Sequence, residues 1–263
     1  MKPKVIFFGQ DWRSTIVLKK LIKSGRFEIA ATVPDPSSII RTIKKSPRAE
    51  VGILASFGAK VPKKIIDFFP KGILVVHPSL LPKYRGAKPT AWTILNGDEE
   101  SGVTIIKITE EFDQGPIVSQ VREKVSPQDT AESLEKRLFE IGGETLVNIL
   151  PDYCKGKIKV RPQPDKNATP APKLNKNQAK IDWKKTPKEI DRLVRAFDPW
   201  PGAWTLLLPH SRDSEGQAKR LKILKAHVEN DKLILDLVQL ESKKPVTWKQ
   251  FCEGYPEAKI IKQ

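Results

Sequence analysis

Short runs of almost uninterrupted apolar residues recur through the first half of the sequence and separate segments with helical spacing. The clearest runs are residues 51–57 and 73–76. Strands without polar alternation are buried on both faces, and strands that alternate with helices form parallel sheets. The sequence therefore predicts an α/β fold with a mostly parallel sheet. Other strands are expected at residues 4–9, 27–33, 103–108 and 117–121, and helices at 15–24, 37–45, 63–69, 90–95 and 130–150.

The composition changes after the first 155 residues. Residues 156–177 are rich in Lys, Pro, Asn and Gln, which is typical of a semi-rigid linker. Beyond it, a helix is expected at 186–197, followed by short strands that suggest a small barrel or sandwich. We therefore expect a first domain over residues 1–155, a linker over 156–177 and a second, β-rich domain over 178–263.

The chain is strongly basic, with a formal net charge of +16 and a pI of about 9.7. Such an excess attracts polyanions, and the alternative explanation is a lysine-rich proteome in which every protein surface is basic. Cys154 and Cys252 are too far apart to form a C-x-x-C pair, which favours a reducing compartment. No apolar run is long enough for a signal peptide or a membrane span. We expect a soluble, cytoplasmic protein.

Two kinds of site are not expected. His77, His210 and His227 stand alone in the sequence, without the paired spacing of a zinc site, so no metal is predicted. Gly9 closes the first strand, but no Gly-rich phosphate loop follows it, so a dinucleotide is not predicted either.

His77 and Asp113 are the strongest candidates for chemistry. His77 directly follows an apolar strand, and ligands of open α/β sheets bind at the carboxyl ends of the strands. An imidazole oriented by a carboxylate suits general acid–base catalysis, although a single His after a strand can also be structural. Ser79 lacks the G-x-S-x-G surroundings of a nucleophile, and Glu110 and Glu111 are expected to be solvated.

Several motifs resemble the formyltransferase family that uses 10-formyltetrahydrofolate. In the first half these are HPSLLPKYRGAKP from His77, GVTI from Gly102 and FDQG from Phe112. The second half is similar to the tRNA-directed branch of that family, the methionyl-tRNA formyltransferases. Its motifs are TPAPKL from Thr169, IDW from Ile181, RAFDPWPGAWT from Arg195 and QLESKKP from Gln239.

The resemblance implies a Rossmann-like catalytic domain with a small, oligonucleotide-binding-like (OB-like) β-barrel behind it. It also implies a monomer that transfers the formyl group of 10-formyltetrahydrofolate to the amino group of initiator methionyl-tRNA, without a metal. His77 and Asp113 are implied as catalytic, and the Asp113 loop as the holder of the pterin. The implied folate-binding residues are Ser79, Leu80, Leu81, Pro82, Arg85 and Gly86.

Val75 departs from the family pattern, which has an Asn two residues before the His. Valine donates no hydrogen bond, so one donor to the oxyanion of the transfer reaction is missing. Loss of one such donor typically costs a factor of about 10²–10³ in rate. A backbone N–H, a water molecule or Asn96 could take its place, or the enzyme is slow or inactive.

The segment over residues 34–50 is the second departure, because the family usually has a long basic loop there that reaches the tRNA acceptor end. The candidates to replace that loop are Arg41, Lys44, Lys45 and Arg48.

Two other hypotheses stay open at this point. A formyltransferase that acts on a nucleotide-linked amino sugar fits the short segment, but the C-terminal motifs and the charge argue against it. A non-catalytic homologue that binds tRNA or folate fits the loss of the Asn.

Overall fold

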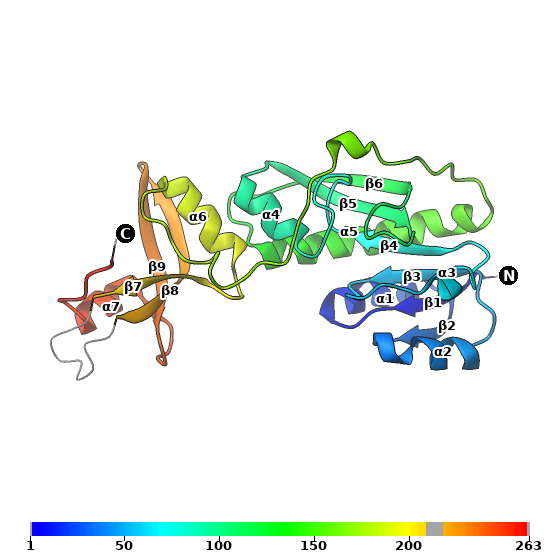
Figure 1. Ribbon diagram of the computed structural model, residues 1–263, viewed down its shortest axis with the longest axis horizontal. Helices are drawn as coiled ribbons and strands as arrows, with labels where there is room; N and C mark the ends of the chain where they lie inside the picture. Colours follow the sequence, from blue (N-terminus) through cyan, green and yellow to red (C-terminus); the bar gives the residue numbers. More distant parts are fainter. Residues whose placement is uncertain (1, 209–217, 262–263) are drawn as a thin grey trace. The chain divides into compact units, whose positions relative to one another are not determined.

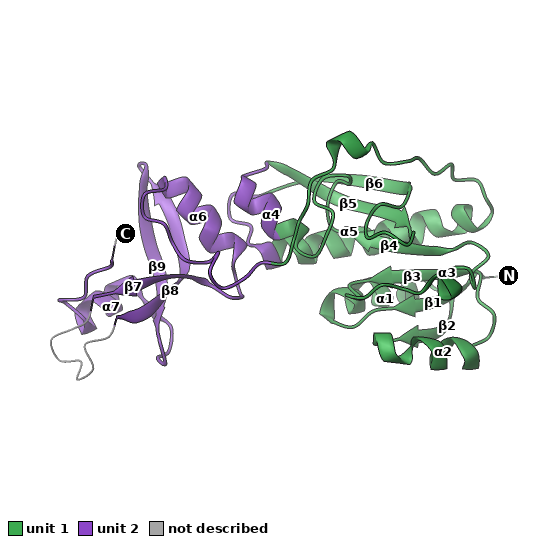
Figure 2. Ribbon diagram, in the orientation of Figure 1, with its two compact units in different colours: residues 1–90, 99–125, 133–173 green, residues 91–98, 126–132, 174–263 purple. Residues whose placement is uncertain are grey.

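The computed structural model describes residues 2–208 and 218–261. The chain folds into two compact units, shown in Figure 2. Unit 1 contains residues 1–90, 99–125 and 133–173, and unit 2 contains residues 91–98, 126–132 and 174–263. The predicted division into two domains and a linker stays a prediction. No helix among the described residues is both long and apolar enough to cross a bilayer.

Unit 1 is built on a six-stranded sheet with the order β2-β1-β3-β4-β5-β6 (Figure 1). The first four strands run parallel, and β5 and β6 continue the sheet as an antiparallel hairpin. This arrangement confirms the predicted α/β fold with a mostly parallel sheet. The strands are β1 (Lys4–Phe8), β2 (Glu28–Val33), β3 (Val51–Ala55), β4 (Ile73–His77), β5 (Glu100–Lys107) and β6 (Ile117–Lys124).

Helices cover both faces of this sheet. α1 (Trp12–Ser24) and α5 (Ala131–Cys154) contribute Val17, Leu21 and Leu146 to one apolar core, together with inward-facing side chains of the strands. On the opposite face, α2 (Ile39–Lys45) contributes Ile39 and Ile43 to a second core, and α3 (Lys63–Ile66) packs against it. Two short 3₁₀ helices complete the unit, η1 (Pro36–Ser38) and η2 (Asp165–Asn167).

Three helix boundaries differ from the expectation by three residues or more, and one of them is the end of α5, which lies at Cys154 rather than at Leu150. α1 begins three residues early because Asp11 is its N-cap and forms a capping box with Ser14. α3 ends at Ile66, three residues before the predicted end. Pro70 explains only why the helix cannot include Phe69, because a proline disfavours the helical conformation of the residue before it.

Unit 2 has an antiparallel sheet with the order β10-β9-β8-β7 around one apolar core. The expectation of a second, β-rich part is confirmed, and closure of this sheet into a barrel stays a prediction. Its elements are α6 (Pro187–Ala196), β7 (Ala203–Leu207), β8 (Lys219–Glu229), β9 (Lys232–Leu240), β10 (Val246–Thr247) and α7 (Trp248–Gly254). Residues 91–96 of α4 (Pro89–Asn96) also belong to unit 2.

Candidate active site

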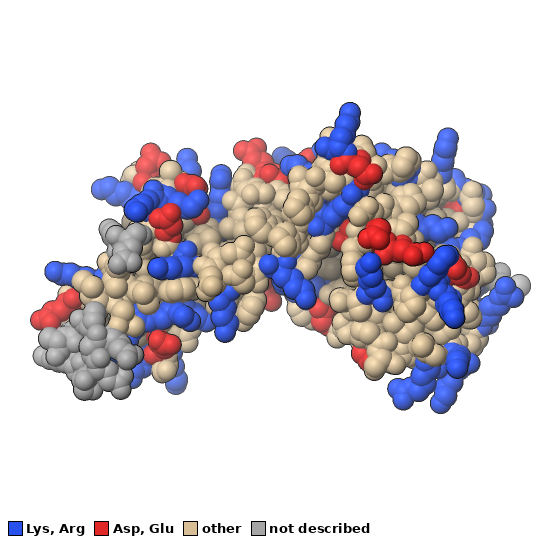
Figure 3. Space-filling view, viewed as in Figure 1, with Lys and Arg blue, Asp and Glu red and all other residues tan. Residues whose placement is uncertain are grey.

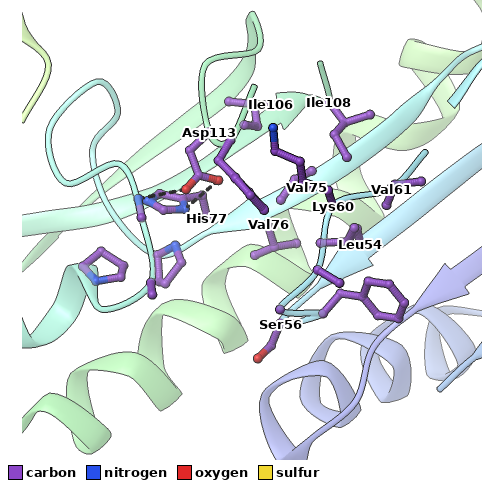
Figure 4. Close-up of a pocket in the computed structure, with 18 of the residues that line it drawn as sticks. Leu54, Ser56, Lys60, Val61, Val75, Val76, His77, Ile106, Ile108 and Asp113 are labelled. Carbon is purple, nitrogen blue, oxygen red and sulfur yellow. Dashed lines mark hydrogen bonds and ion pairs between the residues drawn. The ribbon is translucent and has the colours of Figure 1, made fainter. Parts of the chain in front are cut away.

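His77 and Asp113 lie together at the carboxyl end of β4. His77 is the last residue of the strand, and Asp113 comes from the loop between β5 and β6. The distance between His77 Nδ1 and Asp113 Oδ1 is 3.5 Å (Figure 4). The two side chains are only 6% and 16% exposed. The structure thus brings together the two residues that the sequence suggested for acid–base chemistry.

The surroundings of His77 favour its doubly protonated form. Nε2 lies 2.9 Å from the carbonyl oxygen of Tyr84, which can only accept, so Nε2 carries a proton. Nδ1 faces the Asp113 carboxylate, which favours a proton there as well. Burial disfavours the charged ring, but the charge of Asp113 and the hydrogen bonds outweigh this effect and raise the pKa of His77 above its usual value.

Asp113 is held in its ionised form by the same contacts. Burial favours the neutral acid, but the charge of His77, its hydrogen bond and the backbone N–H of Gly86 lower the pKa of Asp113. The N–H of Gly86 donates to Oδ2 over 2.9 Å. Gly86 has a φ of 128°, and a Cβ there would lie 2.6 Å from the oxygen of Ala171, so only glycine lets the backbone approach.

A cavity of about 500 Å³ opens beside the pair. His77 and Asp113 lie at one end of it in Figure 4, and apolar side chains at the carboxyl ends of the central strands form much of its wall. The β5–β6 loop and the loop after β3 form its rim. The apolar wall includes Leu54, Val61, Val75, Ile106 and Ile108, and the polar and charged lining residues include Ser56, Lys60, Thr109, Glu110, Glu111, Glu135 and Lys173.

Val75 lines this cavity and is 9% exposed. Side chains two positions apart point to the same side of a strand, so Val75 and His77 share one side of β4. A donor at position 75 would therefore lie next to the imidazole, and this chain has two methyl groups there. Asn96, named above as a replacement, belongs to the other compact unit.

The residues expected to bind folate build the turn that leads from β4 to Gly86. Gly86 itself lines the cavity, whereas the other five predicted residues, Ser79, Leu80, Leu81, Pro82 and Arg85, do not. Ser79 is fully buried, and its hydroxyl donates to the oxygen of Lys83 over 2.7 Å. Thr104 anchors the turn, since its hydroxyl donates to the oxygen of Ser79 and accepts from the N–H of Leu81. Leu80, Leu81 and Pro82 thus shape the turn, and their role in folate binding stays a prediction.

Arg85 points away from the cavity and holds Gln163, which the sequence did not reveal as a site residue. The guanidinium donates to Gln163 Oε1 over 3.0 and 2.8 Å. Gln163 Nε2 donates in turn to the backbone oxygens of Asp113 and Gly115, over 2.8 and 2.7 Å. Gln163 lies in the segment interpreted as a linker, and its contacts fix the position of the Asp113 loop.

A second, partly buried charged cluster was not predicted either. It contains Asp11, Arg13, Ser56 and Glu135, and the last two line the cavity. Arg13 Nη1 lies 2.5 Å from Asp11 Oδ2, and its Nε lies 2.7 Å from Glu135 Oε2. Asp11 and Ser56 follow strands β1 and β3, and Arg13 and Glu135 lie in the first turns of helices α1 and α5. Only the position of Asp11 and Ser56 after apolar strands could have indicated it.

The remaining candidates lie outside this site. No group of three His, Cys, Asp or Glu in the described part of the chain could hold a metal ion. His227 pairs with Asp236 over 2.9 Å in unit 2, and His210 lies outside the described residues. The possible replacements for the basic loop are exposed, on α2 or just after it, and their role stays a prediction: Arg41, Lys44, Lys45 and Arg48.

Two family models match the chain, "Formyl transferase" over residues 14–150 and "Formyl transferase, C-terminal domain" over residues 173–233. The chain is 31% identical over 239 residues to a methionyl-tRNA formyltransferase of Roseiflexus, with 78% of this chain and 74% of the relative covered. It is 40% identical over 174 residues to the methionyl-tRNA formyltransferase of Chloroflexus aurantiacus, with 66% and 56% covered. The chain thus spans little more than half the length of some of these relatives.

Solved structures show the same fold at low sequence identity. The methionyl-tRNA formyltransferase from Clostridium thermocellum matches with a TM-score of 0.69 and 19% identity, covering 91% of this chain and 99% of that one. HypX from Aquifex aeolicus, in a complex with tetrahydrofolic acid, matches with a TM-score of 0.74 and 16% identity, covering 98% and 48%.

Proposed function

The chain belongs to the formyl transferase family, and from this premise we propose that it transfers the formyl group of 10-formyltetrahydrofolate to the amino group of initiator methionyl-tRNA. The observation that carries the proposal is the buried His77–Asp113 pair beside a cavity of about 500 Å³. Relatives with the name methionyl-tRNA formyltransferase support the choice of acceptor.

His77 and Asp113 divide the proton chemistry between them in this proposal. The Nδ1–Oδ1 distance of 3.5 Å exceeds that of an ordinary hydrogen bond, so the Nδ1 proton can be shared with a ligand oxygen. His77 in its charged form would donate this hydrogen bond. Asp113, which stays ionised, would accept the proton that the attacking amine loses, directly or through a water molecule. That proton would pass to the folate nitrogen as its bond to the formyl carbon breaks and tetrahydrofolate leaves.

The cavity fits a flat, largely apolar ring system with a polar end. Its aliphatic walls can hold such a ring, and the His77–Asp113 pair at one end provides the convergent polar groups of a small-molecule site. When bound, 10-formyltetrahydrofolate would supply an electrophilic one-carbon group. We propose that the turn over residues 79–82 shapes this site and that Gly86 and Arg85 keep Asp113 in place, Gly86 directly and Arg85 through Gln163.

The tRNA would be held mainly by charge. Residues 155–188 contain eleven Lys and Arg but only two Asp and Glu. Figure 3 shows basic side chains spread over both units on the face in view. Phosphate contacts of this kind are strongly salt-dependent, so the logarithm of the tRNA affinity should fall linearly with the logarithm of the salt concentration. We further propose that the protein acts as a cytoplasmic monomer, in keeping with the free cysteines Cys154 and Cys252.

The decisive experiment measures formyl transfer from 10-formyltetrahydrofolate to initiator tRNA charged with methionine. We expect formylmethionyl-tRNA as the product, and no product when the methionine carries an acetyl group on its nitrogen. A correctly folded protein that gives no product above background would refute the proposed function.

A further inference from the structure

The cluster of Asp11, Arg13, Ser56 and Glu135 carries an unbalanced negative charge. Oδ2 of Asp11 accepts from Arg13 Nη1 and from the hydroxyl of Ser56, at 2.5 and 2.8 Å. Oδ1 accepts from the backbone N–H groups of Arg13 and Ser14, at 3.0 and 3.3 Å. Asp11 therefore has no free acceptor position toward a ligand, and one guanidinium is left to balance two carboxylates.

Glu135 carries the excess charge toward the cavity. It is 8% exposed and lines the cavity one helical turn before Phe139. Within the described residues, Arg13 is its only side-chain partner, and this contact is made through Oε2, 2.7 Å from Arg13 Nε. The other oxygen is available to a ligand. A buried carboxylate with an unmatched charge is costly unless a cation comes to lie beside it.

The other buried carboxylate of the cavity has its own cation. Asp113 is paired with His77 and accepts the N–H of Gly86. The charged lysines of the lining, Lys60 and Lys173, are exposed residues of its rim, and Lys60 lies near Glu111 of the β5–β6 loop. Glu110 and Glu111 of the rim are exposed, so among the described residues the unmatched buried carboxylate of the cavity wall is Glu135, on the side formed by α5.

We propose that Glu135, held in place by Arg13, binds the protonated amino group of the acceptor before transfer. This inference rests on the proposed function, in which the acceptor is an amine. An α-amino group has an ordinary pKa of about 7.7–8.0, so such an acceptor arrives largely as an ammonium ion. Arg13 orients Glu135. The bound ammonium then releases one proton to solvent and becomes the attacking amine, and the proton that the amine loses on attack goes to Asp113. Glu135 is therefore a residue for acceptor recognition.

The test compares two ligands that differ only in the cation. Initiator tRNA is charged either with methionine or with its α-hydroxy analogue, and equilibrium binding to the full chain is measured without 10-formyltetrahydrofolate. We expect the wild type to bind the amine form about tenfold or more tightly, which is typical of a hydrogen bond to a charged group. Glu135→Gln should remove this preference. Glu144→Gln, on the same helix with a side chain 61% exposed, should retain it.

A double variant serves as the control for misfolding, because Glu135→Gln alone deprives Arg13 of one of its ion-pair partners. Arg13→Gln combined with Glu135→Gln removes both members of the pair and should also lose the preference. The inference is overturned if either variant keeps the wild-type preference, or if the wild type binds both tRNAs equally. A preference that depends on Glu135 in a protein that transfers no formyl group would sustain the inference and refute the proposed function.

Discussion

The two charge assemblies of unit 1, one nearly buried and one partly exposed, differ in the balance of their charges. The His77–Asp113 pair contains one group of each sign, and its cation is an imidazole, which can release a proton near neutral pH. The Asp11–Arg13–Glu135 cluster contains two carboxylates and a guanidinium, which stays charged. A balanced pair with a mobile proton suits proton transfer, whereas a fixed excess charge suits the binding of a cation. In the roles proposed above, the chemical step and acceptor recognition belong to two different assemblies along one cavity.

Asp113→Asn should have the largest effect and gives the strictest test of this division. The carboxamide cannot accept a proton, so we expect kcat to fall by a factor of about 10²–10⁴ with little change in the acceptor KM. Asp236→Asn is a matched control, because Asp236 also contacts a histidine, His227, but at an exposed position of unit 2. Steady-state kinetics of formyl transfer would measure both variants. A kcat loss in Glu135→Gln as large as that in Asp113→Asn would contradict the division.

Val75→Asn should change the rate in the opposite direction. It places an amide donor on the same side of β4 as His77, and one such donor typically contributes a factor of about 10²–10³ in rate. We expect a higher kcat at some cost in thermal stability, because the new amide is nearly buried. Val75→Leu keeps the position apolar and should not be faster than the wild type. An unchanged or lower kcat in Val75→Asn would show that the missing donor is not limiting.

Gln163→Leu should have a smaller effect, because it acts through the position of Asp113. The variant loses the hydrogen bonds to the oxygens of Asp113 and Gly115, and we expect kcat to fall about tenfold. Asp165→Asn is its control, since it removes only the partner of Arg85 that is 79% exposed. Kinetics and thermal unfolding would be measured together. A Gln163→Leu protein with normal kcat would show that the loop holds its position without the glutamine.

The contrast between the two assemblies also explains what the sequence could predict. His77 and Asp113 each follow an apolar strand of the same sheet, but β5 runs antiparallel to β4, so these strands end at opposite edges of the sheet. The loop after β5 folds back to bring Asp113 to His77, and the motifs shared with the family, not topology, indicated the pair. Arg13 and Glu135 lie more than one hundred positions apart on two helices, where charged residues usually face solvent. Their pairing depends on how α1 and α5 pack on the sheet, and periodicity cannot supply that information.

Gln163 was hidden for a different reason. Prolines and lysines surround it, and such a composition resembles that of a linker. The segment is nevertheless pinned to unit 1, because Arg161 exchanges backbone hydrogen bonds with Ile117 at 2.7 and 2.9 Å, and Thr169 accepts the N–H of Arg85. Long-range backbone pairing of this kind leaves no local mark in the sequence.

The pH dependence of stability gives the smallest expected effect. It distinguishes the two assemblies because only the His77–Asp113 pair contains an imidazole. The pKa of His77 is raised in the folded protein, so its pairing contributes stability in full below the ordinary value of about 6.5 and loses this contribution as pH rises through the raised value. Asp113 has a lowered pKa and contributes only above that lowered value. The destabilisation by Asp113→Asn should therefore be larger at pH 5.5 than at pH 9, by about 1 kcal/mol.

Denaturant unfolding of the wild type and of Asp113→Asn at both pH values would measure this difference. Glu135→Gln is the comparison, because its cluster contains no imidazole, and its cost should be the same at both pH values. If Asp113→Asn also costs the same at pH 5.5 and pH 9, the proton of His77 does not depend on Asp113, and the two assemblies do not differ in the way proposed. If instead the destabilisation by Glu135→Gln changes with pH, a titrating group acts in the Asp11–Arg13–Glu135 cluster. That result would also contradict the proposed separation between proton transfer and acceptor binding.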